Sequence, residues 1–464
     1  MNVLSFEFLG LVGLSSILLW IICHASLRKY ALMICNIAFL YLLKLDLIHL
    51  CYILGLVLYS FLTGYVLSRN KVRWVLYIFA VIPICVLCYY KYSGYFTGAS
   101  LIMPLGISFY TFKAVSYIAD TYIDKAEAVN PVMVFDYICF FPAFSAGPIH
   151  RAQPFFDQLK NRFIFDYQDQ KNGCIQAGFG LFEKMVLADA LSGYVNAFLS
   201  KDLTGWYTVF GVILYAFQIY ADFDAYSNTA IGAARMMGFH LERNFYTPYL
   251  SASLREFWRR WHISLSSWFR YYIYIPLGGS RKGLLHKWLN TVIVFLVSGL
   301  WHGSTMMFAI WGFGHGVLSV IEDAIRLCWP IKTTNRFLAR VLYFPGILLN
   351  FIIVSVLWVF FRSSTMNEAV TILSSCLNAF HMPISAFKCT AAGITVNELI
   401  WIIIMIAMII ITDVLRNFTD MIKLLSRCPF VLRWAVYVVV AGIAIVFGVY
   451  GPGYDPQDFI YITF

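Results

Sequence analysis

The stretch of residues 288–321 has the sequence WLNTVIVFLVSGLWHGSTMMFAIWGFGHGVLSVI. It contains no aspartate, glutamate, lysine or arginine, and its only titratable side chains are His302 and His315. An apolar run of this length can cross the hydrocarbon core of a bilayer, which is roughly 30 Å thick. The stretch therefore predicts a part of the chain that lies in a membrane.

The composition of the whole chain supports the same conclusion. The 464 residues are 61% hydrophobic and only 12% charged, whereas soluble domains are about half apolar and about a quarter charged. The excess apolar surface must face lipid, and long apolar runs satisfy their backbone groups in lipid as helices. We therefore expect an all-α integral membrane protein, with residues 1–464 forming one multi-pass domain.

Apolar runs that can span the bilayer recur along the chain. The clearest lie near 3–24, 47–67, 74–90, 206–221, 288–321, 341–361, 398–412 and 430–450. Shorter or more polar candidates lie near 31–43, 101–119, 132–147 and 173–199. Together they predict about ten to twelve membrane segments.

The net charge of +10 comes from basic residues between the apolar runs, at 28–29, 69–73 and 255–287. This pattern is typical of cytoplasmic loops in a multi-pass protein and indicates no nucleic-acid partner. It places the N-terminus outside. The run 3–24 has no basic start and carries Glu7, so we interpret it as a retained first span and not as a signal peptide.

Two regions do not have the pattern of simple spans. Residues 101–150 are broken by prolines and glycines, and residues 242–287 are dense in Trp, Tyr and Arg. Irregular backbone at membrane depth is tolerated only where protein or a water-filled cavity satisfies its polar groups. We therefore expect re-entrant or interfacial pieces around a central cavity.

Within the second region, Leu254–Arg270 (LREFWRRWHISLSSWFR) has the pattern of one amphipathic helix. Its apolar stripe is Leu254, Trp258, Trp261, Leu265 and Trp268, and its polar stripe is Arg255, Arg259, His262 and Ser266. One interpretation is a helix on the membrane surface whose arginines reach water. The other is a cationic wall for a phosphate-bearing substrate, because arginine offers forked donors to phosphate.

In 288–321, a single helix would carry a stripe of small or polar residues, namely Ser298, His302, Thr305, Ala309, Gly312 and Gly316. One interpretation is close helix packing, with His302 as an interhelical hydrogen-bonding residue. An ionisable group inside a membrane is costly, however, and indicates function. We predict that His302 is a general base, which requires a neutral imidazole, and that His315 is structural.

A polar island at the end of another apolar run contains Gln218, Asp222, Asp224 and Asn228. Two aspartates beside hydrocarbon need partners, and we expect them to form structural ion pairs with the arginines of 255–270. The cysteines lie mostly inside apolar runs and are interpreted as small apolar residues. The sequence contains no serine-hydrolase elbow, zinc helix or P-loop, so ATP hydrolysis and hydride transfer have no support.

Several segments together match one family. In chain order they are Met103–Phe112 (MPLGISFYTF), Phe144–Ile149 (FSAGPI), Tyr220–Phe223 (YADF), Asn244–Tyr249 (NFYTPY), Glu256–Leu265 (EFWRRWHISL), Tyr274–Gly279 (YIPLGG), Gly299–Gly303 (GLWHG) and the tail Asp458–Phe464 (DFIYITF). The chain thereby resembles the membrane-bound O-acyltransferases, and within them the bacterial branch typified by alginate O-acetyltransferases. The resemblance is dense over residues 100–320.

The resemblance implies a ring of helices around re-entrant segments and a central funnel. It implies that His302 is the catalytic histidine and His262 the second histidine of the motif pair. The implied donor is a cytoplasmic thioester, either acetyl-CoA or an acyl-carrier thioester, with no bound cofactor and no metal. The acceptor is an extracytoplasmic polysaccharide or a periplasmic acetyltransferase partner, and the location is the bacterial inner membrane.

Candidate substrate-binding residues are Arg255, Arg259, Arg260, Trp258, Trp301, Ser298, Asp222 and Asn228. The sequence departs from the family pattern at Tyr271 and Asn228, where the family commonly has acidic residues, so details of donor or acceptor binding can differ. Two alternatives stay open: a DltB-type transfer of D-alanine from a carrier protein toward teichoic acid, and a membrane transporter. A transporter should show paired helix interruptions in two halves, and none is evident in the sequence.

Overall fold

The computed structural model describes residues 5–22, 24–97, 103–161, 164–200, 202–329 and 336–450. Over these ranges the chain is helical and contains no β-strand, which confirms the predicted all-α class. The chain divides into two compact units. The first comprises Met1–Leu181 and Tyr226–Arg243, and the second comprises Phe182–Ala225 and Asn244–Phe464.

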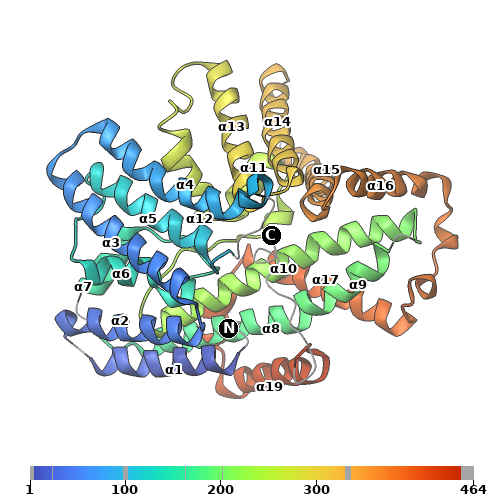
Figure 1. The fold of residues 1–464 in the computed structure, drawn as a ribbon. Coiled ribbons are helices and arrows are strands. Elements are labelled where there is room, and N and C mark those ends of the chain that lie inside the picture. The colour runs from blue at the N-terminus through green and yellow to red at the C-terminus, as the bar shows by residue number, and fades with distance from the viewer. Residues whose placement is uncertain are drawn as a thin grey trace. The chain divides into compact units, whose positions relative to one another are not determined.

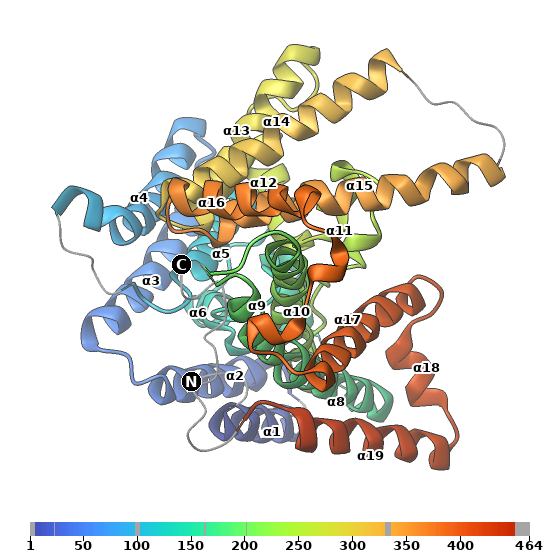
Figure 2. The same ribbon diagram turned by 90° about the vertical axis from the view of Figure 1, so that its right-hand side faces the viewer.

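The first unit begins with α1 (Phe6–Ile21) and α2 (Ala25–Leu42), which lie side by side in Figures 1 and 2. The following helices are α3 (Leu47–Arg69), α4 (Arg73–Thr97), α5 (Ile107–Tyr122), α6 (Pro131–Cys139), α7 (Ala152–Lys160) and α8 (Tyr167–Phe182). Helix α10 (Trp206–Met236) contributes residues to both units.

The second unit contains the remaining elements. Its short pieces are η2 (Glu183–Ala188), η3 (Pro248–Leu250), α11 (Leu254–Arg260), α12 (Ile263–Phe269), η4 (Arg270–Tyr274) and α18 (Met421–Arg427). Its longer helices are α9 (Asp189–Phe198), α13 (Leu284–His302), α14 (Met306–Cys328), α15 (Arg336–Arg362), α16 (Met366–Leu377), α17 (Val396–Arg416) and α19 (Phe430–Phe447).

By length and composition, 7 helical segments of the described chain can cross a membrane. They are Leu47–Arg69, Arg73–Gly94, Leu284–His302, Met306–Cys328, Tyr343–Arg362, Val396–Arg416 and Phe430–Phe447. Phe6–Ile21 is apolar but shorter, and the run 206–221 belongs to α10, which is buried along most of its length. These spans confirm a multi-pass architecture, with fewer qualifying spans than the sequence predicted.

The decisive stretch 288–321 is a helical hairpin and not one helix. Helix α13 ends at His302, residues 303–305 turn the chain, and α14 begins at Met306. The predicted single-helix stripe is therefore wrong, and His302 lies at the end of a span instead of its middle. The two helices lie side by side in Figures 1 and 2.

Glycines allow the two helices of this hairpin to approach closely. A Cβ atom added to Gly299 would lie 2.2 Å from the Phe308 carbonyl oxygen, and one added to Gly312 would lie 2.3 Å from the Phe295 carbonyl oxygen. Both obstacles are backbone atoms, which a side-chain rotation cannot move. Small residues at this interface thus explain part of the predicted stripe, in the manner typical of membrane helix pairs.

We expect Gly312→Ala to destabilise the protein by about 1–3 kcal/mol, because the added methyl group overpacks the hairpin. The matched control is Gly442→Ala in α19, where an added Cβ meets no heavy atom within 4 Å. Thermal unfolding in detergent micelles measures both. Equal midpoints for the two variants would contradict the close approach of α13 and α14.

The two regions predicted to be broken do consist of short pieces. In the first unit, Gly106 has φ 76° and precedes α5, and a Cβ there would lie 2.8 Å from the Phe144 carbonyl oxygen. Buried Lys113 on α5 donates a hydrogen bond to the Ala143 carbonyl at 2.8 Å. These contacts explain why the motifs 103–112 and 144–149 accompany one another. Residues 101–102 lie outside the described ranges.

Candidate active site

The chain breaks its helix at the motif that carries His262. Helix α11 ends at Arg260, α12 begins at Ile263, and His262 between them is left-handed, with φ 41° and ψ 56°. The Ile263 amide donates to the Asn244 carbonyl at 2.8 Å. The segment at Asn244 therefore accepts a hydrogen bond that a continuous helix would make internally. The predicted single amphipathic helix over Leu254–Arg270 is wrong.

This break turns His262 away from the cationic face and into the protein. The side chain is fully buried, and the Phe223 ring lies perpendicular to it at 4.6 Å between centroids. Burial lowers the pKa of His262 to about 3, because a charged imidazole loses its hydration there. His262 is therefore neutral at physiological pH.

His302 lies in a box of aromatic rings. Its side chain is 5% exposed, and the rings of Trp301, Trp311 and Phe361 lie 4.8, 5.0 and 5.5 Å from it between centroids. Trp301 also contacts His262, at 6.3 Å. Both predicted histidines thus contact the same tryptophan, Trp301. Ser298, one helical turn before His302, is buried as well.

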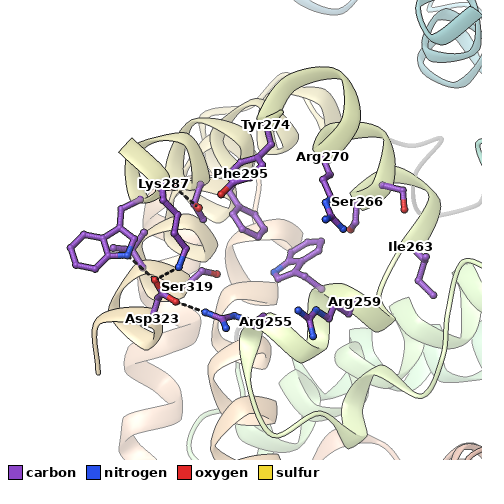
Figure 3. A pocket seen from close by; sticks show the side chains of 15 residues that line it. Arg255, Arg259, Ile263, Ser266, Arg270, Tyr274, Lys287, Phe295, Ser319 and Asp323 are labelled. Carbon is purple, nitrogen blue, oxygen red and sulfur yellow. Dashed lines mark hydrogen bonds and ion pairs between the residues drawn. The ribbon is translucent and has the colours of Figure 1, made fainter. Parts of the chain in front are cut away.

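A pocket of about 420 Å³ lies beside this box, between α11, α12, η4 and the α13–α14 hairpin (Figure 3). Its lining residues are Arg255, Trp258, Arg259, Ile263, Ser266, Ser267, Arg270, Tyr274, Lys287, Trp288, Thr291, Phe295, Ser319, Val320 and Asp323. Four of these side chains are cationic and one is anionic, so the pocket favours a negatively charged ligand.

The four cations of the pocket differ in their partners. Asp323 binds Arg255 and also Lys287, the latter at 2.6 Å (Figure 3). The guanidinium groups of Arg259 and Arg270 are exposed and make no ion pair or hydrogen bond with any residue that the structure describes. Arg259 and Arg270 are therefore the cations available to a ligand.

Two aromatic contacts connect the pocket to the catalytic candidate. Trp258 lines the pocket and lies 5.9 Å from Trp311, and Trp311 lies 5.0 Å from His302. His302 itself is not among the lining residues. The Trp311 ring thus contacts both His302 and the pocket residue Trp258.

A match to a known protein family covers every residue of the pocket and of the aromatic box around His302. The family model described as MBOAT, membrane-bound O-acyltransferase family, matches residues 31–364. The chain belongs to the membrane-bound O-acyltransferase family.

Named relatives within this family support the match. A "Probable alginate O-acetylase AlgI" of Azotobacter vinelandii is 35% identical over 320 residues, covering 65% of this chain and 62% of that protein. The peptidoglycan O-acetyltransferase of Helicobacter pylori is 31% identical, over 61% and 58%. The teichoic acid D-alanyltransferase of Streptococcus thermophilus is 30% identical, over 55% and 66%. The chain thus spans about three-fifths of the length of the first two relatives.

Some candidate residues of this family member do not lie in the pocket. Arg260 is paired with Glu256 at 2.6 Å and donates to the Thr247 hydroxyl at 3.0 Å. Asn228 belongs to the first unit, where it accepts a hydrogen bond from Gln176 at 3.3 Å. The tail Asp458–Phe464, part of the family resemblance, lies outside the described residues.

The partners of the buried aspartates also differ from the prediction. Lys184 binds Asp222 at 2.8 Å and Asp189 at 2.7 Å, and Arg416 binds Asp224 at 2.6 Å. The expected pairing with arginines of 255–270 is wrong, since Arg255 and Arg260 have acidic partners closer in space. The two aspartates of this island do form ion pairs, as predicted, but with other cations.

Several pocket residues were not predicted from the sequence, among them Arg270, Lys287, Trp288, Phe295 and Asp323. Arg270 ends the cationic stretch and could have been included by proximity alone. The others meet only because α13 and α14 fold back on one another. No local sequence pattern predicts that arrangement.

Burial of His262 predicts a pH dependence of stability. Its folded pKa lies below the ordinary value of 6.5, so the unfolded chain binds the proton more readily between pH 6.5 and about 3. The stabilisation is complete above pH 6.5 and is lost as pH falls, by up to about 1.4 kcal/mol per pH unit. Unfolding curves between pH 6.5 and 4.5 should show a flatter dependence for His262→Gln than for wild type.

The control for this prediction is His381→Gln, because His381 is exposed in the 3₁₀ turn Asn378–His381. This variant should keep the wild-type slope. A His262→Gln protein whose stability falls with acid as steeply as wild type would contradict the buried, neutral state of His262.

Proposed function

We propose that the protein transfers a short acyl group, in the first place acetyl, from a cytoplasmic thioester to a hydroxyl group outside the cytoplasm. The observation that carries the proposal is the placement of His302 in an aromatic box whose Trp311 ring contacts the pocket, where Arg259 and Arg270 make no ion pair with any described residue. A proton acceptor and an anion-binding surface at this separation suit a donor with a reactive end and a phosphate-bearing end.

The phosphate of the donor binds Arg259 and Arg270 in this proposal. Arginine presents parallel N–H donors that match phosphate oxygens, and the hydroxyl of Ser266 lies on the same wall (Figure 3). Arg255 and Lys287 contribute positive charge while they remain bound to Asp323. Coenzyme A and the phosphopantetheine arm of a carrier protein share this phosphate chemistry.

Helix geometry supports a donor that runs along the hairpin. Lys287 and Phe295, both on α13, line the pocket. At 1.5 Å per residue they lie about 22 and about 10 Å before His302 along the helix axis. Along α13, the pocket thus presents Lys287 farther from His302 than the ring of Phe295, which contacts Trp258.

The reaction itself is a single displacement at the thioester carbonyl. His302 accepts the proton of the acceptor hydroxyl as that oxygen forms a bond to the carbonyl carbon. The carbon–sulfur bond then breaks, and the histidine returns the proton to the departing thiolate. A positioned base contributes about 10²–10⁴ in rate, and holding both substrates at one point contributes further.

His262 and Trp301 orient the reacting groups in this proposal, because Trp301 contacts both imidazoles. Ser298 is a further polar group on the same turn of α13 as His302. Arg260 and Asp222 act structurally through their ion pairs. In this proposal they therefore do not bind substrate, contrary to the prediction from the sequence.

The names of the relatives support the acceptor class and the location. Two of them are named for O-acetylation of alginate and of peptidoglycan, and all three come from bacteria. We therefore propose a polysaccharide, or a periplasmic acetyltransferase that relays to one, as acceptor, and the bacterial cytoplasmic membrane as location. The D-alanyltransferase relative favours a second candidate, transfer of D-alanine from a carrier protein.

Purified protein in proteoliposomes tests the proposal. Radiolabelled acetyl-CoA is supplied on one side and hydroxylated polysaccharides, alginate and peptidoglycan fragments among them, on the other. We expect thiol release and labelled ester to appear together and to require the polysaccharide. Parallel reactions with a D-alanyl-loaded carrier protein separate the two candidates. A protein that releases thiol with neither donor is not an acyltransferase of this kind.

A further inference from the structure

The indole N–H of Trp311 is a buried hydrogen-bond donor beside the catalytic candidate. Trp311 is fully buried, and its Nε1 has no acceptor among the residues that the structure describes. Buried polar groups of native proteins nearly always have a partner, and leaving one without a partner lowers stability. A donor kept in this state calls for an explanation in terms of function.

Neighbouring tryptophans of the same cluster show the usual behaviour. Trp358 stacks on Trp311 at 5.6 Å, and its own Nε1–H donates to the Tyr249 hydroxyl at 3.1 Å. Trp258 packs on Trp311 from the pocket, and its Nε1–H donates to His315 Nδ1 at 3.2 Å. These two indoles hold the Trp311 ring in place while their own donors are satisfied. Among these three tryptophans, only Trp311 has a donor without an acceptor in the described part of the chain.

The position of Trp311 relates that donor to the reaction. Its ring stands nearly perpendicular to the imidazole of His302, with centroids 5.0 Å apart and an interplanar angle of 88°. It also separates His302 from Trp258 on the pocket wall. Of the rings around His302, that of Trp311 is therefore the one in contact with the pocket residue Trp258.

We propose that Trp311 is a catalytic residue whose Nε1–H donates a hydrogen bond to the thioester carbonyl oxygen as negative charge develops there. The inference rests on the proposed acyl transfer at His302. When the acceptor oxygen attacks, the electron pair of the carbonyl double bond moves onto its oxygen, and the indole N–H stabilises that oxyanion. When the carbon–sulfur bond breaks, the double bond forms again, and the indole keeps its proton throughout.

A neutral, fixed donor suits this role in an apolar site. His302 is 5% exposed and Trp311 is fully buried, so a single hydrogen bond there acts in a low dielectric and needs no reorganisation during the reaction. The substrate then supplies the acceptor that the Trp311 N–H lacks in the free protein. This also explains how an unsatisfied donor is compatible with a well-packed cluster.

Two substitutions at Trp311 test the inference. Trp311→Phe removes the N–H and part of the ring, and replacement by 3-benzothienylalanine exchanges the N–H for sulfur while the ring keeps its size. We expect both to lower kcat for acetyl transfer by roughly 10²–10³-fold, the usual effect of losing one oxyanion donor. The KM for acetyl-CoA should change little, because the hydrogen bond strengthens only in the transition state.

The matched control is Trp358→Phe, which removes an N–H that already has a partner from the ring stacked on Trp311. It should lower the unfolding temperature and change kcat less than tenfold. By contrast, the benzothienylalanine protein should be at least as stable as wild type, since it loses only an unpaired donor. Loss of the N–H should therefore lower kcat but not stability at Trp311, whereas it should lower stability but hardly kcat at Trp358.

A kcat at the wild-type value in the benzothienylalanine protein would overturn the inference. This test remains valid if Trp311→Phe fails to fold. A loss of kcat in Trp358→Phe as large as in Trp311→Phe would overturn it too, since packing alone would then explain the effect. Failure of the underlying acyl transfer is recognised separately. In that case wild type itself produces no ester, or His302→Ala produces it at the wild-type rate.

Discussion

Substitution of His302 by alanine is expected to lower kcat for acyl transfer by about 10²–10⁴, the contribution of a positioned general base. In the proposed reaction the imidazole is the proton acceptor, and it lies in the aromatic box formed by Trp301, Trp311 and Phe361. Alanine leaves the donor pocket unchanged, because His302 does not line it. The KM for acetyl-CoA should therefore stay near its wild-type value in a steady-state assay of ester formation.

The matched control for this prediction is His150→Ala in the first unit. His150 is also buried and is also surrounded by rings, those of Tyr137, Phe140 and Phe155. Both variants lose a similar amount of packing, so both should unfold at lower temperature. Only His302→Ala should lose activity. Equal transfer rates for the two folded variants would remove the general-base role of His302.

The second large effect is expected at the unpaired arginines of the pocket. Arg259→Gln and Arg270→Gln should each raise the KM for acetyl-CoA roughly tenfold, because a hydrogen bond to a charged group contributes about 1.5 kcal/mol or more. The double variant should raise it roughly a hundredfold if the two effects add. The kcat should stay unchanged, since binding of the phosphate is equally strong in ground and transition states.

Substitutions of two other arginines distinguish a defined phosphate site from a general effect of positive charge on the KM. Arg281→Gln removes the same charge from an exposed position of the same basic segment, outside the pocket lining. It should leave the KM within a few-fold of wild type. Arg260→Gln breaks the ion pair with Glu256 and should lower stability while the KM is kept. A KM that depends equally on Arg259 and Arg281 would contradict a defined phosphate site.

The membrane class could be predicted, and the two histidine motifs could be found, because both depend on residues that are consecutive in the sequence. Apolar runs of about twenty residues have few alternatives to a membrane helix. The break at His262 was not predictable, since the spacing of Trp258, Trp261 and Leu265 continues the helical period across it. The chain leaves the helix there because Asn244, distant in sequence, accepts the Ile263 amide hydrogen.

The charge pairs could not be predicted for a related reason. Asp222 needed a cation, and the sequence offered several arginines within fifty residues, but the nearest cation in space is Lys184, on the six-residue π-helical segment Glu183–Ala188. The pocket likewise joins residues from five helical elements, α11, α12, η4, α13 and α14. Which of its arginines is free depends on where the carboxylate of Asp323 lies, and that position is a property of the folded hairpin.

The binding of Arg416 has a consequence for how short a working version of this protein can be. The family match ends at residue 364, which invites truncation there. Arg416 at the end of α17 binds Asp224, and Tyr220 donates to Asp413 of the same helix at 2.8 Å. A chain cut before α17 would leave the buried Asp224 carboxylate without its cation, at a cost of about 3–5 kcal/mol. A minimal fragment therefore has to extend through residue 416.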